Sequence, residues 1–353
     1  MASARDLGLS FGSQPTGPGN SLTDAPGVRV GHVTRIDGDV RTGCTAILPH
    51  DGNLYRHKVP AAVEVINGFG KSAGLMQVQE LGTIETPILL TNTFAVGTGV
   101  NALIRRAIAA NPDIGRETAT VNPVVCECND GWLNDIQAMS LTEADMAAAV
   151  DAALSPAGGA PVSQGAVGGG TGMSCFGFKG GIGSASRRIT LDEADYTVGL
   201  LVQANFGRPG DLTLPDGRRA KPPRTKDAAQ PERGSIIIIL ATDIPLEHRQ
   251  LWRVARRCGA GLARLGAFWG HGSGDIALAF TTADRIAHDE TRALVPRTTL
   301  NESRIDLLFR AAAEGTQEAV LNALCAATAT TGRAGHVRPA LADWLDAHPG
   351  AGL

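Results

Sequence analysis

The chain has 353 residues, a net charge of −3, 43% hydrophobic residues and 19% charged residues. This composition is typical of a folded protein with a sizeable core, and it excludes a disordered or collagen-like chain. No excess of positive charge is present to attract nucleic acid. Glycine is over-represented, with 44 of 353 residues against a usual frequency of about 7%.

Secondary-structure patterns begin after residues 1–20, which are rich in Gly, Ser and Pro and are expected to form a loose arm before a single domain over residues 21–353. Short β-branched runs bounded by Gly, Pro, Asn or Asp predict strands at residues 43–49, 61–68, 87–97, 118–128, 196–206, 235–243 and 275–283. Helical patterns cover residues 100–110, a segment opened by Ser140 and Glu143 in capping-box spacing, 246–265 and 303–327. The chain is therefore predicted to be α/β, with helices sandwiching the sheets.

Residues 208–233 contain seven Arg or Lys, five Pro and no aliphatic cluster. Such a segment buries too little surface to order itself strongly. It ends at a Gly-Ser bond, directly before the hydrophobic run Ile236–Leu240. A polar segment is therefore expected to meet a buried strand at the Gly234–Ser235 bond.

The glycine tract at residues 168–188 fits neither a dinucleotide fingerprint nor a phosphate loop. It is predicted to form a hairpin whose glycines permit close backbone approach.

The six cysteines include no C-x-x-C pair and the histidines show no i, i+4 pair, so we expect core thiols and no metal site. The longest aliphatic run is too short for a membrane span and residues 1–20 lack an apolar signal segment, which predicts a cytoplasmic protein.

The Gly234–Ser235 junction allows two interpretations. Taken alone, it is a pair of small residues entering a strand. In the functional interpretation, Ser235 cuts the bond before it by an N-to-O acyl shift and becomes an N-terminal nucleophile. Its free α-amino group has a reference pKa of about 7.7–8.0, so it can accept the proton of its own hydroxyl at neutral pH.

Three further clusters offer chemistry, although each also fits an ordinary turn. Ser273 and Asp275 are two residues apart at the start of a strand and are expected to face the same side, where they can pass protons. Asn205 ends a long apolar strand, and its amide is a good oxyanion donor. Glu127 supplies negative charge at a strand end, close to the aromatic wall of Trp132.

These clusters occur together in one order, and the chain resembles the family of L-aminopeptidase/D-esterases and β-peptidyl aminopeptidases. The resemblance extends over most of the chain and includes the strings LTDAPGVRVGHVT, NDGWLNDI, GAVGGGTGMSCFGFKGGIGSASR, YTVGLLVQANFG, RGSIIIILATD and GSGDIALAF. It implies a four-layer αββα sandwich similar to that of N-terminal-nucleophile hydrolases. It also implies self-cleavage before a serine that then becomes the nucleophile.

Carried over by position, the resemblance places the nucleophile on Ser235, the oxyanion donor on Asn205, and the later serine and acidic pair on Ser273 and Asp275. Asp275 departs from the Glu of better-known members, which shortens its reach. Trp132 stands where some members carry Tyr, so a hydroxyl donor is replaced by an apolar wall.

The expected activity is that of a serine aminopeptidase cut into residues 21–234, with their arm, and residues 235–353. Ser235 would form an acyl-enzyme, and Asn205 with the Gly274 N–H would hold the oxyanion. Glu127 or Asp275 would bind the substrate ammonium group. The partner is a small peptide or amino-acid amide of L, D or β type. No cofactor, nucleic acid or membrane is implied, and the resemblance suggests a homotetramer.

Two alternatives stay open. One is an acyltransferase of the ornithine acetyltransferase type, which has a similar fold but uses Thr at the new N-terminus. The other is a non-catalytic module whose glycine-rich loops bind a small anion.

In the aminopeptidase interpretation, the glycine tracts at residues 68–74, 168–183 and 270–274 line a tight pocket around Ser235.

Overall fold

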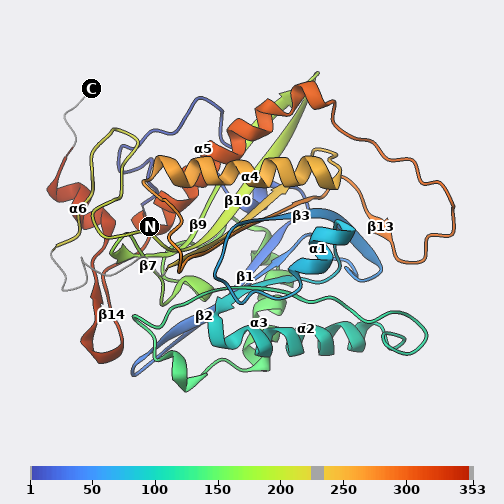
Figure 1. The fold of residues 1–353 in the computed structure, drawn as a ribbon, viewed down its shortest axis with the longest axis horizontal. Coiled ribbons are helices and arrows are strands. Elements are labelled where there is room, and N and C mark those ends of the chain that lie inside the picture. Colours follow the sequence, from blue (N-terminus) through green and yellow to red (C-terminus); the bar gives the residue numbers. More distant parts are fainter. Residues whose placement is uncertain (1, 224–233, 350–353) are drawn as a thin grey trace.

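Two β-sheets packed face to face form the centre of the molecule (Figure 1). The computed structural model describes residues 2–223 and 234–349. The larger sheet contains β3 (His57–Gly68), β4 (Thr83–Ile84), β9 (Gly181–Leu191), β10 (Ala194–Asn205), β11 (Ser235–Thr242), β12 (Gly274–Thr281) and β13 (Ile286–Ala287). Its strand order is β13-β3-β12-β11-β10-β9, with β4 paired to β3. The smaller sheet, in the order β1-β2-β5-β6, contains β1 (Arg29–Asp37), β2 (Val40–Leu48), β5 (Ile88–Asn92) and β6 (Val124–Cys128).

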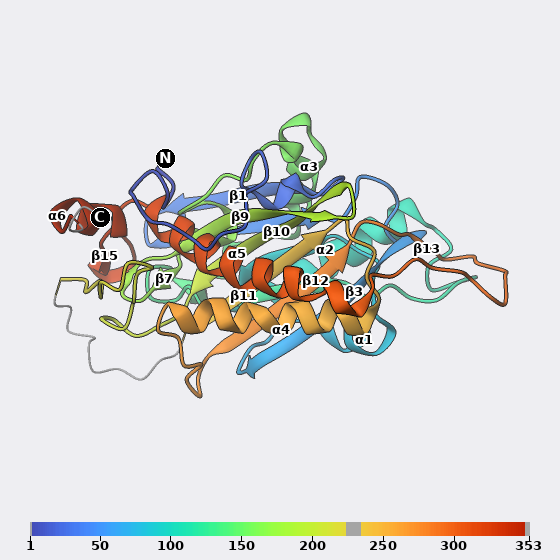
Figure 2. The ribbon, with the colours of Figure 1, turned by 90° about the horizontal axis from the view of Figure 1, so that it is seen from above.

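Helices cover the outer faces of both sheets. The helices are α1 (Leu75–Leu81), α2 (Val96–Ala110), α3 (Glu143–Leu154), α4 (His248–Arg264), α5 (Asp306–Cys325) and α6 (Leu341–Ala347). Helices α4 and α5 lie on the larger sheet, whereas α2 and α3 lie beneath the smaller one (Figures 1 and 2). The resulting four layers confirm the predicted αββα sandwich.

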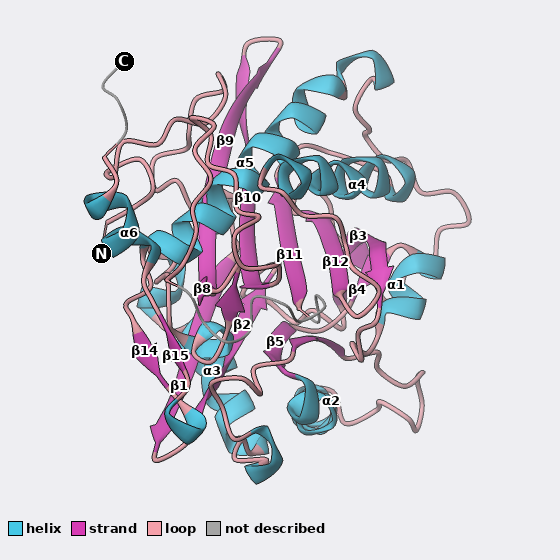
Figure 3. Cartoon of the chain, turned by 60° about the vertical axis from the view of Figure 1, so that its left-hand side comes forward, coloured by secondary structure: helices cyan, strands magenta, loops and turns pink. Residues whose placement is uncertain are grey.

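Strand β11 shows why the core needs two layers of cover. All eight of its residues are buried. Ile236 and Ile238 point into the core beneath the helices, whereas Ile237 and Ile239 point into the core between the sheets. A strand that is apolar on both faces has to be covered on both sides, and Figure 3 shows β11 in the middle of its sheet.

Local capping corrects two predicted boundaries. The strand predicted at residues 87–97 ends at Asn92, because the Asn92 side chain accepts a hydrogen bond from the Ala95 N–H (3.0 Å) and α2 begins at Val96. Helix α3 is capped by Thr142, not opened at Ser140: Thr142 and the Asp145 side chain form the reciprocal capping box.

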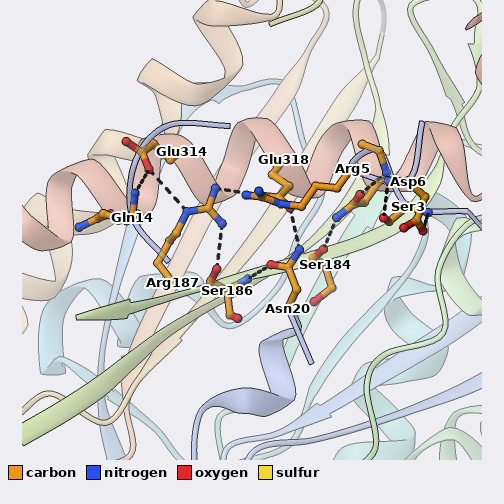
Figure 4. A network of polar contacts seen from close by, with 12 residues as sticks. Ser3, Arg5, Asp6, Gln14, Asn20, Ser184, Ser186, Arg187, Glu314 and Glu318 are labelled. Atoms are coloured by element: carbon orange, nitrogen blue, oxygen red, sulfur yellow. Dashed lines mark hydrogen bonds and ion pairs between the residues drawn. The ribbon is translucent and has the colours of Figure 1, made fainter. Parts of the chain in front are cut away.

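The N-terminal arm was expected to be loose, but the structure ties its described residues to the helical layer. Leu9 and Phe11 are buried in the core beneath the helices. Arg5 forms an ion pair with Glu318 of α5 (2.6 Å), which also pairs with the fully buried Arg187 of β9 (2.7 Å). Figure 4 shows this network. The composition of the arm did not predict these contacts, because a few apolar and charged residues are enough to hold a Gly- and Pro-rich segment in place.

The structure describes only part of the segment that was predicted to order itself weakly. Residues 208–223 are folded back on the core, with Leu212, Leu214 and Ala220 buried. The Ala220 N–H donates to the Leu212 carbonyl (2.9 Å). The remainder of the predicted segment, residues 224–233, lies outside the described residues.

The glycine-rich tract forms β7 (Ser174–Cys175), β8 (Phe178–Lys179) and the start of β9. Strands β7 and β8 pair antiparallel, which confirms the predicted hairpin. At Gly183, a Cβ atom would lie 1.9 Å from the Ala319 carbonyl oxygen of α5. Glycine is therefore required here so that helix and sheet can pack closely.

The six cysteines are all buried and form no disulfide within the described residues, as predicted for core thiols. Among the described residues, no helix has the length and apolarity needed to cross a membrane.

Candidate active site

Strand pairing brings the predicted nucleophile, oxyanion donor and cleavage site together where the central strands of the larger sheet begin or end. Ser235, the first residue of β11, pairs with Asn205, the last residue of β10. On its other side Ser235 pairs with Gly274, the first residue of β12. Gly274 in turn pairs with Gly68, where β3 ends. The loops that extend β10 and β3 and those that precede β11 and β12 therefore converge around Ser235.

The Gly274 N–H is shared by two atoms of the Gly234–Ser235 junction. It lies 3.2 Å from the Ser235 Oγ and 3.2 Å from the Gly234 carbonyl oxygen. Hydrogen bonding to a carbonyl oxygen stabilises the negative charge that grows there when a nucleophile attacks. One N–H group therefore touches both the attacking hydroxyl and the carbonyl that it would attack.

The backbone is tightly enclosed at Gly234. A Cβ atom there would lie 2.3 Å from the Asn205 carbonyl oxygen and 2.5 Å from the Phe206 Cα. Both neighbours are backbone atoms, which cannot rotate out of the way. Only glycine fits at the residue before Ser235 without moving the chain.

Two hydrogen bonds fix the orientation of the Asn205 amide. Its Oδ1 accepts from the Ser174 N–H (2.8 Å), and its Nδ2 donates to the Asn129 carbonyl (2.9 Å). Because an amide nitrogen carries two hydrogens, one is left for a further acceptor. Asn129 lines the cavity described below and Asn205 does not, so the amide nitrogen lies one hydrogen bond away from a lining residue.

Ser273 and Asp275 are completely buried and interact with each other. The Ser273 hydroxyl donates to Asp275 Oδ1 (2.7 Å), so the shorter Asp side chain reaches its serine. The two residues flank Gly274, the strand partner of Ser235. Neither lines the cavity, and their part in proton transfer stays a prediction.

A cavity of about 770 Å³ opens over Ser235. Its wall combines aromatic, polar and charged side chains. The lining residues are Phe69, Lys71, Thr93, Glu127, Asn129, Arg208, Ser235, Phe268, Gly270, His271 and Gly272. Of the predicted substrate-binding residues, Glu127 belongs to this set and Trp132 does not.

Glu127 lies at the end of β6 and is 3% exposed. Its Oε1 accepts from the Lys71 N–H (2.8 Å), and its Oε2 accepts from the Thr93 hydroxyl. Within residues 2–223 and 234–349, no lysine or arginine forms an ion pair with it. The cavity therefore contains a positioned carboxylate that can receive a cationic group.

Trp132 packs away from this cavity. Its ring stacks on His336 (centroids 4.0 Å apart), whose Nδ1 also interacts with the Trp132 carbonyl (2.8 Å). The Arg338 guanidinium lies over the same ring at 4.4 Å. The tryptophan thus joins the loop after β6 to the C-terminal part of the chain. The structure does not place it beside Ser235, where it was predicted to contact the substrate.

A buried lysine that supports Asn205 was not predicted from the sequence. The Lys179 Nζ donates to the carbonyls of Gly170 (2.9 Å), Met173 (2.9 Å) and Gly180 (2.7 Å). Burial lowers the pKa of Lys179 to about 7, although the charge of Asp130 opposes this shift. Met173 precedes Ser174, whose N–H orients the Asn205 amide. The signal in the sequence was a single lysine inside an apolar, glycine-rich run.

Two of the glycine tracts predicted to line the pocket around Ser235 do so, since Lys71 lies in the tract at residues 68–74 and His271 in the tract at residues 270–274. No role was predicted for these two side chains. Arg208 was missed, because it begins the segment expected to be weakly ordered. Its proximity to Ser235 depends on how the loops converge, which local sequence does not reveal.

The layered fold, with a serine as the first residue of a central strand, is that of the N-terminal-nucleophile hydrolases. The L-aminopeptidase D-Ala-esterase/amidase from Ochrobactrum anthropi, described as a variant of that fold, superimposes with a TM-score of 0.87, at 35% identity and with 99% of each chain covered. The PH0078 protein from Pyrococcus horikoshii superimposes with a TM-score of 0.89, at 46% identity and with 98% of each chain covered.

The profile of Peptidase family S58 matches residues 20–338, and the chain belongs to this family. Beta-peptidyl aminopeptidase BapA from Sphingosinicella microcystinivorans is 38% identical over 358 residues, which cover 94% of this chain and 88% of that protein. Family and relatives together assign the chain to the serine-type aminopeptidases, which are hydrolases.

Replacing Gly234 with Ala should slow or abolish the predicted self-cleavage of the Gly234–Ser235 bond. The added Cβ would overlap backbone atoms and displace the Gly234 carbonyl from the Gly274 N–H. The amount of cut chain, followed by denaturing electrophoresis after synthesis, measures the effect. Gly97→Ala on α2, where a Cβ meets no atom within 4 Å, is the matched control. Cleavage of Gly234→Ala at the rate of the unmodified protein would contradict the geometry.

Proposed function

We propose that the chain cuts its own Gly234–Ser235 bond and then acts as an aminopeptidase through Ser235. The observation that carries this proposal is the shared Gly274 N–H, which lies 3.2 Å from both the Ser235 Oγ and the Gly234 carbonyl oxygen. Membership of a peptidase family supports a catalytic function over a non-catalytic binding module.

Maturation begins when Ser235 Oγ attacks the Gly234 carbonyl carbon. The Gly274 N–H stabilises the oxyanion, the peptide C–N bond breaks, and the nitrogen gains a proton to become the α-amino group of Ser235. Water then hydrolyses the ester, which leaves a carboxylate on Gly234 and restores the Ser235 hydroxyl. The products are residues 1–234, with the arm at 1–20, and residues 235–353, which remain one αββα domain.

The mature site uses the same donors for its substrate. Ser235 Oγ attacks the carbonyl of the substrate's N-terminal residue while the Ser235 amine takes the hydroxyl proton. The second Asn205 Nδ2 hydrogen and the Gly274 N–H hold the oxyanion. The leaving amine departs with a proton, and water hydrolyses the acyl-enzyme. Ser273 and Asp275, which are bonded to each other beside Gly274, assist these proton transfers.

An aminopeptidase must also recognise a free ammonium group, and Glu127 is the residue proposed for this contact. It lines the cavity that contains Ser235 and has no ion-pair partner among the described residues. Asp275 was the other carboxylate predicted for this contact, but it accepts a hydrogen bond from Ser273 and does not line the cavity. The substrates proposed are peptides, amides or esters with a free N-terminal amine, in keeping with the names of the relatives.

We further propose a cytoplasmic homotetramer. Six buried cysteines that form no disulfide within the described residues suit a reducing compartment. Met76 and Leu81 on α1 are 85% and 62% exposed, and apolar side chains this accessible support association with another subunit. The measurement is light scattering of the purified enzyme.

Replacing Ser235 with Ala should leave one uncut chain of 353 residues, because no hydroxyl remains to attack Gly234. Intact mass spectrometry distinguishes this species from the pieces 1–234 and 235–353. Ser303→Ala, at an exposed serine far along the chain, should be cut normally. Cleavage of Ser235→Ala, or an active enzyme that remains one chain, would refute the proposed maturation.

Replacing Asn205 with Ala should lower kcat by about 10²–10³-fold, the usual cost of removing an oxyanion donor. The assay is p-nitroanilide hydrolysis by protein that has first been cut in full, so that slow maturation does not reduce the rate. Asn101→Ala, exposed on α2, is the control. A normal kcat for Asn205→Ala would remove this side chain from the mechanism.

A further inference from the structure

The charged groups of the cavity are arranged by sign. Glu127, the one carboxylate among the lining residues, is 3% exposed, whereas Lys71 and Arg208 are exposed. The cavity therefore has an acidic interior and a basic mouth. A substrate with an ammonium group at one end and a negative charge at the other would match both.

Arg208 is available to bind such a negative charge. In the part of the chain that the structure describes, it forms no ion pair, although neighbouring surface arginines such as Arg218 pair with carboxylates. Its guanidinium group offers the planar set of donors that matches a carboxylate. The structure therefore leaves a cation at the cavity wall with no described protein anion to neutralise it.

Strand order places Arg208 and Glu127 on opposite sides of the nucleophile. In the larger sheet the order is β3-β12-β11-β10. Gly70 follows β3, and a Cβ atom on it would lie 3.6 Å from Glu127 Oε1 and 3.8 Å from the Gly274 Cα. Arg208 instead follows β10, three residues after Asn205. The ammonium site thus lies toward β3, Ser235 lies on β11, and Arg208 lies beyond it.

This order corresponds to the direction of a peptide substrate. The ammonium group belongs to the acyl part, the carbonyl is attacked at Ser235, and the leaving group extends toward β10. The Glu127 carboxylate lies beside Gly70, which packs on Gly274 of β12, and β12 and β10 are two strand spacings apart, about 10 Å. An extended tripeptide is also about 10 Å long.

We infer that Arg208 binds the C-terminal α-carboxylate of the leaving group, so that the preferred substrates are di- and tripeptides with a free C-terminus. This inference rests on the proposed function of Ser235 as the nucleophile. Arg208 acts as a specificity-determining residue: it selects which leaving groups bind and takes no part in proton transfer.

The test uses cut enzyme and one N-terminal residue X, chosen as the residue removed fastest from a p-nitroanilide. The substrates are X-Ala, X-Ala amide and X-Glu amide, together with the uncharged X-p-nitroanilide. The unmodified enzyme should cleave X-Ala with a kcat/KM about tenfold above that for X-Ala amide, which corresponds to about 1.4 kcal/mol. The difference should appear mainly in KM.

Arg208→Gln should reduce this ratio to about one and leave p-nitroanilide hydrolysis unchanged. Arg208→Lys, which keeps the charge but loses the planar donors, should give an intermediate ratio. Arg116→Gln, at an exposed arginine outside the cavity, should keep the full preference. Lys71→Gln removes the other cavity cation, which lies on the β3 side, and should also keep the ratio.

Each remaining outcome contradicts the inference in a recognisable way. A ratio near one in the unmodified enzyme, or an unchanged ratio in Arg208→Gln, would overturn it. A preference for X-Glu amide equal to that for X-Ala would assign Arg208 to acidic side chains instead. An equal loss on all four substrates would show a structural role. Absence of p-nitroanilide hydrolysis for every X would instead refute the proposed function itself.

Discussion

The register of three adjacent strands determines the rest of this site. Because Ser235 pairs with Asn205 on β10 and with Gly274 on β12, its hydroxyl, the carbonyl before it and two N–H donors are fixed within one strand spacing on either side. A shift of one residue in β11 would turn Ser235 to the opposite face of the sheet. The buried isoleucines prevent this shift, since alternate residues belong to two different cores.

The same register explains why the layers around it are so closely packed. Gly183 allows α5 to approach β9, and the buried Arg187 is neutralised by Glu318 of that helix and so ties the sheet to it. On the inner side, Lys179 holds the segment whose N–H orients Asn205. A buried charge that loses its partner is strongly destabilising, so the Arg187–Glu318 pair also fixes the position of the helical layer on the larger sheet. The site is therefore held rigid by contacts that lie outside it.

Much of this arrangement could be predicted from the sequence, and the exceptions have physical causes. The alternation of strands and helices, the Gly234–Ser235 junction and the hairpin of the glycine tract depend on local pattern, which the sequence shows directly. Three glycine tracts were predicted to line a pocket around Ser235. Those at residues 68–74 and 270–274 contribute to the cavity wall, but no residue of 168–183 does, and Gly183 serves layer packing instead. Long-range contacts also placed Trp132 against His336 and packed the arm through Phe11, and no local pattern encodes such contacts. The roles assigned to the site residues stay predictions; these residues are Ser235, Asn205, Gly274, Ser273, Asp275 and Glu127.

The central claim is that Ser235, freed by cleavage, carries the acyl group. The most direct measurement is a peptide map of enzyme quenched with acid during turnover of a p-nitrophenyl ester that deacylates slowly. The account predicts an acyl mass on the N-terminal peptide of the 235–353 piece, located on the Ser235 oxygen, with a free α-amino group. An adduct on Ser273 or on any cysteine, or a chain that turns over ester while residue 235 remains joined to Gly234, would contradict it.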